Sequence, residues 1–136
     1  MSEAHLIAPA RLEEYGRFSS FLEEQLEQAG VPLPDQMKIL TAFEEILVNI
    51  IHYAYPDSNG QVEIFVTASD HAVEVTFIDQ GIAFDPFSQP VVDTSQPAND
   101  RPVGGLGILM VQRLMDQVRY DRIDQRNRLV IRKEIR

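Results

Sequence analysis

The sequence predicts an α+β fold built as a two-layer sandwich, in which helices cover one face of a mixed β-sheet. Three observations lead to this fold class. Some segments repeat apolar residues every three or four positions, other segments alternate apolar and polar residues, and the two kinds are segregated along the chain. With 136 residues the chain has the size of one domain, so residues 1–136 are expected to fold as a single unit.

The first half of the chain is predicted to contain a short strand followed by two amphipathic helices. The strand lies near residues 4–8, and the first helix spans residues 11–29, where a glycine and two prolines follow. The second helix begins after Pro34, with Asp35 as its candidate N-cap, and ends near Pro56. Its apolar stripe consists of Ile39, Phe43, Ile46, Leu47, Ile50 and Ala54.

The remaining strands are predicted to form two hairpins. Residues 62–68 and 73–78 alternate in hydrophobicity on either side of a short polar turn, which indicates an antiparallel pair. Two final strands are expected at 118–122 and 129–135, joined by a turn at residues 124–127.

A long irregular segment and a third helix separate the two hairpins. Residues 85–103 contain four prolines and show little periodicity. Such a segment inside a compact domain is most often a functional lid or an insertion, and we predict a lid. Glycines at 104, 105 and 107 then open the third helix, whose apolar residues continue to Val118.

Composition excludes several classes of protein. The chain has no cysteine and only three histidines, which argues against disulfide scaffolds, zinc fingers, iron–sulfur ligation and cysteine nucleophiles. A net charge of −9 repels a phosphate backbone, so no direct nucleic-acid binding is expected. No apolar run approaches the ~20 residues of a membrane span, and the first ten residues do not resemble a signal peptide. We therefore predict a cytoplasmic protein without a membrane partner.

The second helix carries a candidate catalytic pair. Glu45 and Asn49 are four residues apart, which places them on one helix face, roughly opposite the apolar stripe. A carboxylate and a carboxamide in this arrangement suit a general base and a metal ligand. Taken alone, such a pair is more often the solvated side of a helix.

An acidic turn follows the first hairpin. Asp79 ends a hydrophobic strand, and Gly81 two residues later permits close approach of a ligand to the backbone. A buried acceptor at this point would suit the amino group of adenine. The alternative interpretation is an ordinary Asp-x-Gly turn.

A glycine-rich stretch precedes the third helix. Free N–H groups and the helix dipole favour an anionic phosphate at such a start. The Gly-Gly-Leu-Gly sequence at 104–107 matches neither the dinucleotide-binding nor the P-loop pattern, and the chain lacks the His-Arg-Asp motif of eukaryotic-type kinases. A glycine hinge that closes the long loop is the alternative.

The order and spacing of these motifs resemble the GHKL ATPases and, within that superfamily, the anti-sigma-factor serine/threonine kinases of the RsbW/SpoIIAB type. The resemblance covers essentially the whole chain. It is carried by Phe-Glu-Glu-Ile-Leu-Val-Asn-Ile-Ile-His-Tyr-Ala-Tyr at 43–55, Asp-Gln-Gly at 79–81 leading to Phe-Asp-Pro at 84–86, and Gly-Leu-Gly at 105–107 leading to Leu-Met-Asp-Gln-Val at 114–118.

The resemblance implies a Bergerat ATP-binding fold, the fold of histidine kinase-like ATPases, with a defined set of site residues. Asn49 would bind the Mg²⁺ that bridges the ATP phosphates, and Glu45 would be the general base. Asp79 would accept the adenine amino group, while Gly81 would let the base lie against the backbone. The other residues that the resemblance places at the nucleotide are Tyr53, Gly105, Leu106 and Gly107.

The resemblance also implies a reaction and partners. The γ-phosphoryl group of ATP would pass to a serine or threonine of an anti-anti-sigma (STAS-domain) protein, and the chain would sequester a partner such as a sigma factor. The first strand would contribute to a homodimer. Two alternatives stay open: a nucleotide-gated binding module with negligible transfer, and a histidine-phosphorylating ATP-binding domain, which the Phe-Asp-Pro signature and the lack of a preceding histidine-bearing helix disfavour.

Overall fold

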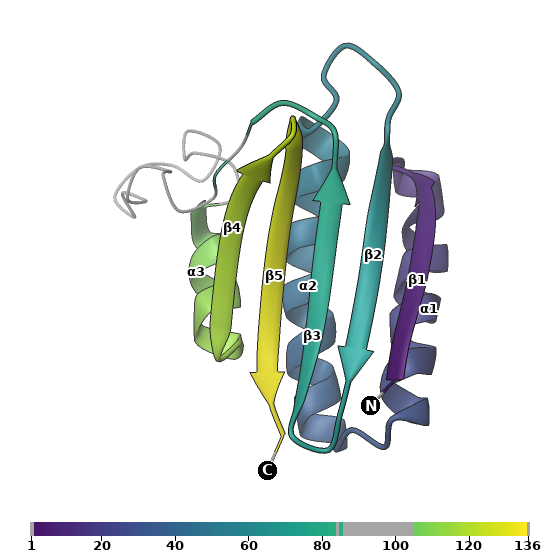
Figure 1. Cartoon of the computed structure of the whole chain (residues 1–136), viewed down its shortest axis with the longest axis vertical. Coiled ribbons are helices and arrows are strands. Elements are labelled where there is room, and N and C mark those ends of the chain that lie inside the picture. The colour runs from purple at the N-terminus through teal and green to yellow at the C-terminus, as the bar shows by residue number, and fades with distance from the viewer. Residues whose placement is uncertain (1, 84, 86–104, 136) are drawn as a thin grey trace.

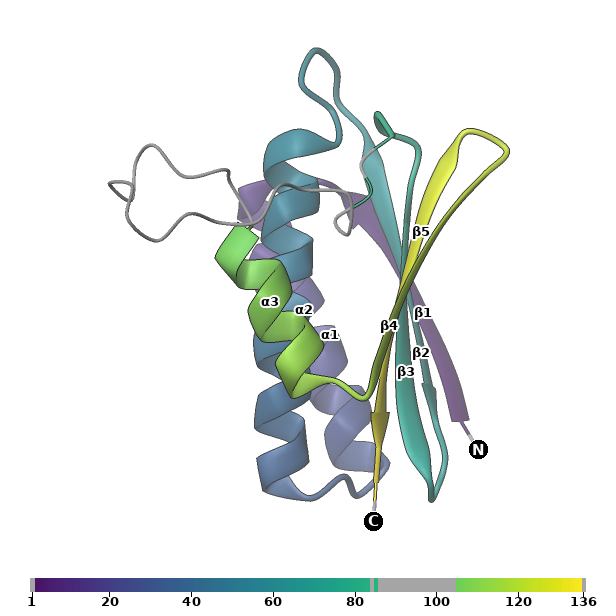
Figure 2. The same ribbon diagram turned by 90° about the vertical axis from the view of Figure 1, so that its left-hand side faces the viewer.

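The computed structural model describes residues 2–83, 85 and 105–135, which form two layers (Figure 1). Its elements are the strands β1 (Ser2–Pro9), β2 (Gln61–Ala68), β3 (Ala72–Asp79), β4 (Gln117–Ile123) and β5 (Arg126–Glu134), and the helices α1 (Tyr15–Gln28), α2 (Leu33–Tyr53) and α3 (Gly105–Leu114). The strands form one sheet, and Figure 2 shows the three helices on one face of it. The predicted α+β two-layer sandwich with helices on one face is confirmed.

The sheet is antiparallel in every pairing of the described strands, whereas the sequence predicted a mixed sheet. The strand order is β1-β2-β3-β5-β4. Strands β3 and β4 run in the same direction, but β5 lies between them and pairs with both. Because α3 delivers β4 to the outer edge and a hairpin returns β5 beside β3, no parallel pair forms.

The turn between β4 and β5 is shorter than predicted. Asp124 and Gln125 have positive φ angles of 53° and 64°, the backbone of a two-residue hairpin turn that matches the twist of the strands. Strand β5 therefore begins at Arg126, and Asn127 belongs to the strand instead of the turn. In the β3–β5 register, Asn127 lies directly opposite Asp79.

The two long helices begin differently from the sequence-based expectation. A short 3₁₀ turn, η1 (Leu12–Glu14), precedes α1. Helix α2 begins at Leu33 with Pro32 at the capping position, so the cap predicted at Asp35 is wrong, and Asp35 lies within the first turn. Proline fits a helix start because the first N–H groups have no partner within the helix. None of the helices in the described ranges is both long and apolar enough to cross a membrane.

The hydrophobic core fills the space between the layers. The fully buried side chains include Phe18, Leu22, Ile39, Phe43, Leu47, Ile64, Phe77 and Ile131. The rings of Phe43 on α2 and Phe77 on β3 lie 5.3 Å apart between centroids. This contact joins the helix that carries Glu45 and Asn49 to the strand that ends at Asp79, so the core sets the distance between the predicted motifs.

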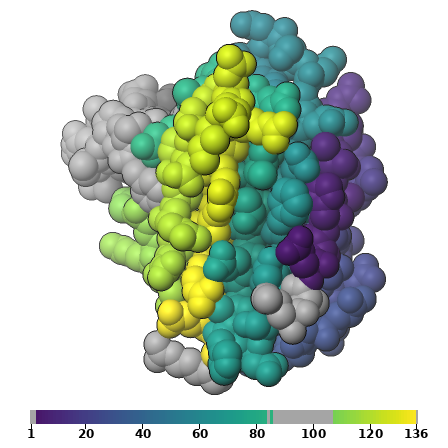
Figure 3. Space-filling model, in the orientation of Figure 1, coloured from purple at the N-terminus to yellow at the C-terminus, as the bar shows by residue number. Residues whose placement is uncertain are grey.

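The opposite face of the sheet carries no helix among the described residues, and Figure 3 shows it. Several of its side chains pair with one another. Glu74 forms ion pairs with Arg132 at 2.7 Å and Arg119 at 3.6 Å, and His5 stacks on Phe65 with ring centroids 4.4 Å apart. The predicted site residues lie instead on the helix side of the sheet.

Candidate functional site

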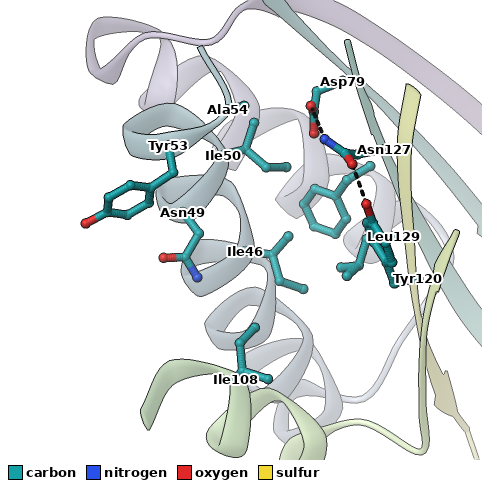
Figure 4. Close-up of a pocket in the computed structure, with 11 residues that line it drawn as sticks. Ile46, Asn49, Ile50, Tyr53, Ala54, Asp79, Ile108, Tyr120, Asn127 and Leu129 are labelled. Atoms are coloured by element: carbon teal, nitrogen blue, oxygen red, sulfur yellow. Dashed lines mark hydrogen bonds between the residues drawn. The ribbon is translucent and has the colours of Figure 1, made fainter. Parts of the chain in front are cut away.

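A pocket opens between α2 and the sheet (Figure 4). It contains about 480 Å³ of empty space, including its open mouth. Its lining consists of Ile46, Asn49, Ile50, Tyr53 and Ala54 from α2 and its end, Phe77, Asp79, Tyr120, Asn127 and Leu129 from the sheet, and Ile108 from α3. Apolar walls with a few convergent polar groups suit a flat organic ring that has a hydrogen-bonding edge.

Asp79 provides a buried acceptor at the sheet wall of this pocket. The residue is only 4% exposed. Its Oδ1 accepts hydrogen bonds from the Gly81 N–H and from Asn127 Nδ2, both at 2.9 Å. Burial raises the pKa of the Asp79 carboxyl above its ordinary value, while the bonds from Asn127 and Gly81 and the charge of Arg122 act in the opposite direction. No hydrogen bond among the described residues uses Oδ2, which is therefore available to a ligand.

Asn127 is a site residue that the sequence did not reveal. Its Nδ2 also donates to the Ile82 carbonyl at 2.7 Å, and its Oδ1 accepts from the Tyr120 hydroxyl at 2.5 Å and from Arg122 Nη1 at 3.1 Å. The sequence placed Asn127 in a turn. A predicted two-residue turn at 124–125 would have placed Asn127 in the strand, on the face that lines the pocket.

Gly81 has a packing role that differs from the one predicted. A Cβ atom at Gly81 would lie 2.2 Å from the carbonyl oxygen of Ala54. The same oxygen accepts a hydrogen bond from the Ile82 N–H at 2.9 Å. The turn after β3 is thus pressed against the end of α2, and the glycine is required by this contact. Close approach of a ligand to Gly81 stays a prediction.

We expect Gly81→Ala to destabilise the fold by about 1–3 kcal/mol or more, because the new methyl group meets backbone atoms that cannot move independently. Gly16→Ala is the matched control, since nothing lies within 4 Å of a Cβ at Gly16 in α1. Urea denaturation of both variants measures the difference. Equal unfolding free energies for the two variants would contradict the packing role.

Tyr55 holds the loop that follows α2. Its hydroxyl donates to the Gln61 carbonyl at 2.6 Å and accepts from the Gln80 N–H at 2.7 Å. A Cβ at Gly60 would lie within 2.1 Å of the Tyr55 ring. Burial raises the pKa of the Tyr55 hydroxyl, so it stays a neutral donor and acceptor at physiological pH. These two hydrogen bonds connect the loop to the start of β2 and to the residue that follows Asp79 at the end of β3.

Glu45 and Asn49 lie where α2 meets α3. A Cβ at Gly107 would lie 2.3 Å from Glu45 Oε2, so the carboxylate contacts the first turn of α3. Asn49 Nδ2 is buried, and no described residue gives it a hydrogen-bond partner. The sequence left open a solvated helix face, but both residues are half-buried because α3 lies alongside.

The structure brings most of the predicted site residues together. Asn49, Tyr53 and Asp79 line one pocket, although the Tyr53 ring points away from the sheet in Figure 4. Gly105, Leu106 and Gly107 form the start of α3, and Gly107 contacts Glu45. Residues 86–103 of the predicted lid lie outside the described residues.

The pocket has features that fit a nucleotide and its metal. The unpaired, buried Asn49 Nδ2 calls for an acceptor, such as a phosphate oxygen, and the Asn49 amide oxygen is of the type that Mg²⁺ prefers. No three acidic or histidine side chains converge within the described part of the chain. A metal at Asn49 would therefore depend on oxygens supplied by the bound ligand and by water.

The model of the histidine kinase-like ATPase domain matches residues 8–133. The chain belongs to this family. Among curated proteins, it is 31% identical to the serine-protein kinase RsbW of Bacillus thuringiensis (strain Al Hakam) over 88 residues, which make up 62% of this chain and 54% of the kinase. It is 28% identical to RsbW of Halalkalibacterium halodurans over 117 residues, or 83% and 72% of the two chains. It thus spans about half the length of the Bacillus kinase.

Solved structures agree with this family's fold. The RsbU and RsbW domains of a Mycobacterium tuberculosis protein superpose with a TM-score of 0.72 at 17% identity, covering 99% of this chain and 33% of that one. The mycobacterial sensor histidine kinase MprB superposes with a TM-score of 0.56 at 18% identity, covering 96% and 99%. At these identities the similarity shows the fold alone.

Proposed function

We propose that this chain is a cytoplasmic, ATP-dependent serine/threonine protein kinase and anti-sigma regulatory factor. It would transfer the γ-phosphoryl group of ATP to a serine or threonine of an anti-anti-sigma (STAS-domain) protein, and it would sequester a partner such as a sigma factor. The observation that carries the proposal is that buried Asp79 lines an apolar pocket together with Asn49 and that its Oδ2 accepts no hydrogen bond from the described residues. Similarity to RsbW supports the choice of substrate class.

Adenine recognition is assigned to the sheet wall. Ile50 on one side and Phe77 and Leu129 on the other offer apolar surface to the faces of the base. Asp79 Oδ2 accepts a hydrogen from the exocyclic amino group. A charge-assisted bond in such a buried place is stronger than the same bond in water.

Phosphate and metal binding are assigned to the helix side. The Asn49 amide oxygen would hold Mg²⁺, which neutralises charge on the transferred phosphoryl group. The backbone N–H groups of Gly105 and Gly107 at the start of α3 would face the phosphates, where the helix dipole favours negative charge.

Glu45 is proposed as the general base. The serine hydroxyl of the substrate attacks the γ-phosphorus, its proton passes to the Glu45 carboxylate, and the bond between the γ-phosphorus and the bridging oxygen breaks to leave ADP. Glu45 lies one helical turn from Asn49 and against Gly107, so it is close to both groups that would hold the phosphates. Positioning and charge neutralisation carry most of such a reaction.

A nucleotide-gated binding module with negligible transfer is the second candidate. One observation favours it: no lysine or arginine is among the described residues that line the pocket, so these residues provide no cationic side chain for the phosphates. Under this alternative the chain would bind Mg·ATP and exchange partners without chemistry.

Incubation of the purified chain with γ-labelled ATP and the STAS protein encoded nearest to it tests the proposal. Labelled phosphoserine or phosphothreonine in the STAS protein is the expected result. Binding of Mg·ATP without any label in the partner would favour the binding module, and absence of ATP binding would reject both candidates.

A homodimer is also proposed. Strand β1 lies at the edge of the sheet, and the family resemblance assigns this edge to dimerisation. Edge strands offer backbone groups to another chain. Sedimentation of the purified protein at micromolar concentration would show a mass of two chains, and a single-chain mass would reject the dimer.

A further inference from the structure

The amide of Asn127 uses its full hydrogen-bonding capacity in the described structure. The residue is 6% exposed and faces the pocket from β5. Both Nδ2 hydrogens are donated, to Asp79 Oδ1 and to the Ile82 carbonyl, and Oδ1 accepts from Tyr120 and Arg122. A carboxamide offers two donor hydrogens and two acceptor sites, so none is left over.

The chemistry of these neighbours fixes which way the amide points. Arg122 can only donate, so it must face the amide oxygen. The Ile82 carbonyl and ionised Asp79 can only accept, so they must face the nitrogen. Turning the amide over would place two donors together and several acceptors together. The orientation is therefore set by three elements, β3, β4 and β5, and not by Asn127 alone.

The same network holds the turn that follows β3. Arg122 Nη1 also donates to the Gly81 carbonyl at 2.8 Å, while Asn127 holds the Ile82 carbonyl at 2.7 Å. The bond from Asn127 and the charge of Arg122 both lower the pKa of Asp79, against the larger effect of burial. Asp79 is thus held through Oδ1, which leaves Oδ2 without a hydrogen bond from the described residues, and the bond from Asn127 and the charge of Arg122 support its ionised form.

The sheet wall of the pocket, formed in part by Asp79 and Asn127, consequently offers a ligand the acceptor Oδ2 of Asp79. Among the described residues of this wall, no side-chain donor is left without a partner. A 6-aminopurine presents a donor to such a wall. At the same ring position a 6-oxopurine, such as hypoxanthine or guanine, presents an acceptor oxygen in place of the amino group, and an ionised carboxylate repels this oxygen.

We propose that Asn127 is a positioning residue that sets base specificity, because its donation to Asp79 Oδ1 keeps Asp79 an acceptor and so selects 6-aminopurine over 6-oxopurine nucleotides. This inference rests on the nucleotide site of the proposed function. It goes beyond that function because it assigns the discrimination between bases to a residue that acts through Asp79.

The test compares the affinities for Mg·ATP and Mg·ITP, whose bases differ in the 6-amino and 6-oxo groups, by calorimetry. The wild-type chain should prefer ATP by at least about tenfold. Asn127→Ala should reduce this preference by about tenfold, with the affinity for inorganic tripolyphosphate unchanged. Arg128→Ala is the matched control, because Arg128 is the next residue on β5, is exposed and points to the opposite face of the sheet.

Loss of ATP and ITP affinity by the same factor in Asn127→Ala would overturn the inference, because a merely structural role predicts that result. An unchanged preference would overturn it as well. If circular dichroism shows that Asn127→Ala is unfolded, Asn127→Asp decides the question. A second carboxylate beside Asp79 forces the pair to share a proton, so the ratio of ATP affinity to ITP affinity should fall below that of the wild-type chain. Failure of the wild-type chain to bind ATP would reject the proposed function itself, whereas ATP binding with an unaltered preference would reject only the role of Asn127.

Discussion

Glu45→Ala is expected to slow phosphoryl transfer to the STAS protein by about 10²–10⁴ and to leave the affinity for Mg·ATP nearly unchanged. The reason is the position of the carboxylate. Glu45 lies beside the first turn of α3 and does not line the pocket where the base would bind. Its removal would take away the proposed acceptor of the hydroxyl proton, while the proposed adenine contact at Asp79 would persist.

Single-turnover labelling of the STAS protein and calorimetry with Mg·ATP measure the two quantities. Asn49→Ala should give the complementary result, a loss of Mg·ATP affinity, because a Mg²⁺ held by Asn49 would lose one of its oxygen ligands. Glu44→Ala is the matched control, since Glu44 is the adjacent, exposed carboxylate on α2. If wild type and Glu45→Ala label the partner equally, or if neither labels any partner while both bind ATP, the kinase proposal fails and the nucleotide-gated binding module replaces it.

Asp79→Asn is expected to weaken binding of adenine nucleotides by about tenfold to over a hundredfold, the effect of losing a buried charge-assisted hydrogen bond of ~1.5–3 kcal/mol. The affinity for bare triphosphate should change much less, because the phosphates would bind at α3 and Asn49. Asparagine keeps the size of the side chain but replaces one carboxylate oxygen by a donor, which either faces Asn127 Nδ2 or faces the adenine amino group. Both orientations bring two donors together.

The pH dependence of this binding provides a second measurement. Burial raises the folded-state pKa of Asp79. The ionised carboxylate is the form that would accept a hydrogen bond from adenine. The contribution of Asp79 to affinity is therefore present above that pKa and is lost as the pH falls through it. The difference in ADP affinity between wild type and Asp79→Asn should shrink on acidification. An ATP affinity that is unchanged in Asp79→Asn at neutral pH would reject the adenine assignment.

The sequence by itself determined the elements and the local motifs. Helix and strand periodicities placed α1, α2, β2 and β3 close to their observed bounds, because burial on one face imposes a period that is visible in each segment. The third helix was predicted to reach Val118, but α3 ends at Leu114 and Val118 lies in β4. The candidate residues Glu45, Asn49 and Asp79 were also recognisable from the sequence. Each belongs to a short motif whose spacing is local, and each proved to lie at or beside one pocket.

Only the tertiary structure decided how distant segments meet. The bond between Asp79 and Asn127 joins residues 48 positions apart, and it depends on strand order and on a turn two residues shorter than the sequence suggested. The contacts of Gly81 with Ala54 and of Gly107 with Glu45 likewise arise from packing between elements. Local propensities do not encode register or strand order, since these follow from burying all apolar faces at once. For that reason Asp79 was predictable as an acceptor from its own segment, whereas its hydrogen-bond partner Asn127 was not.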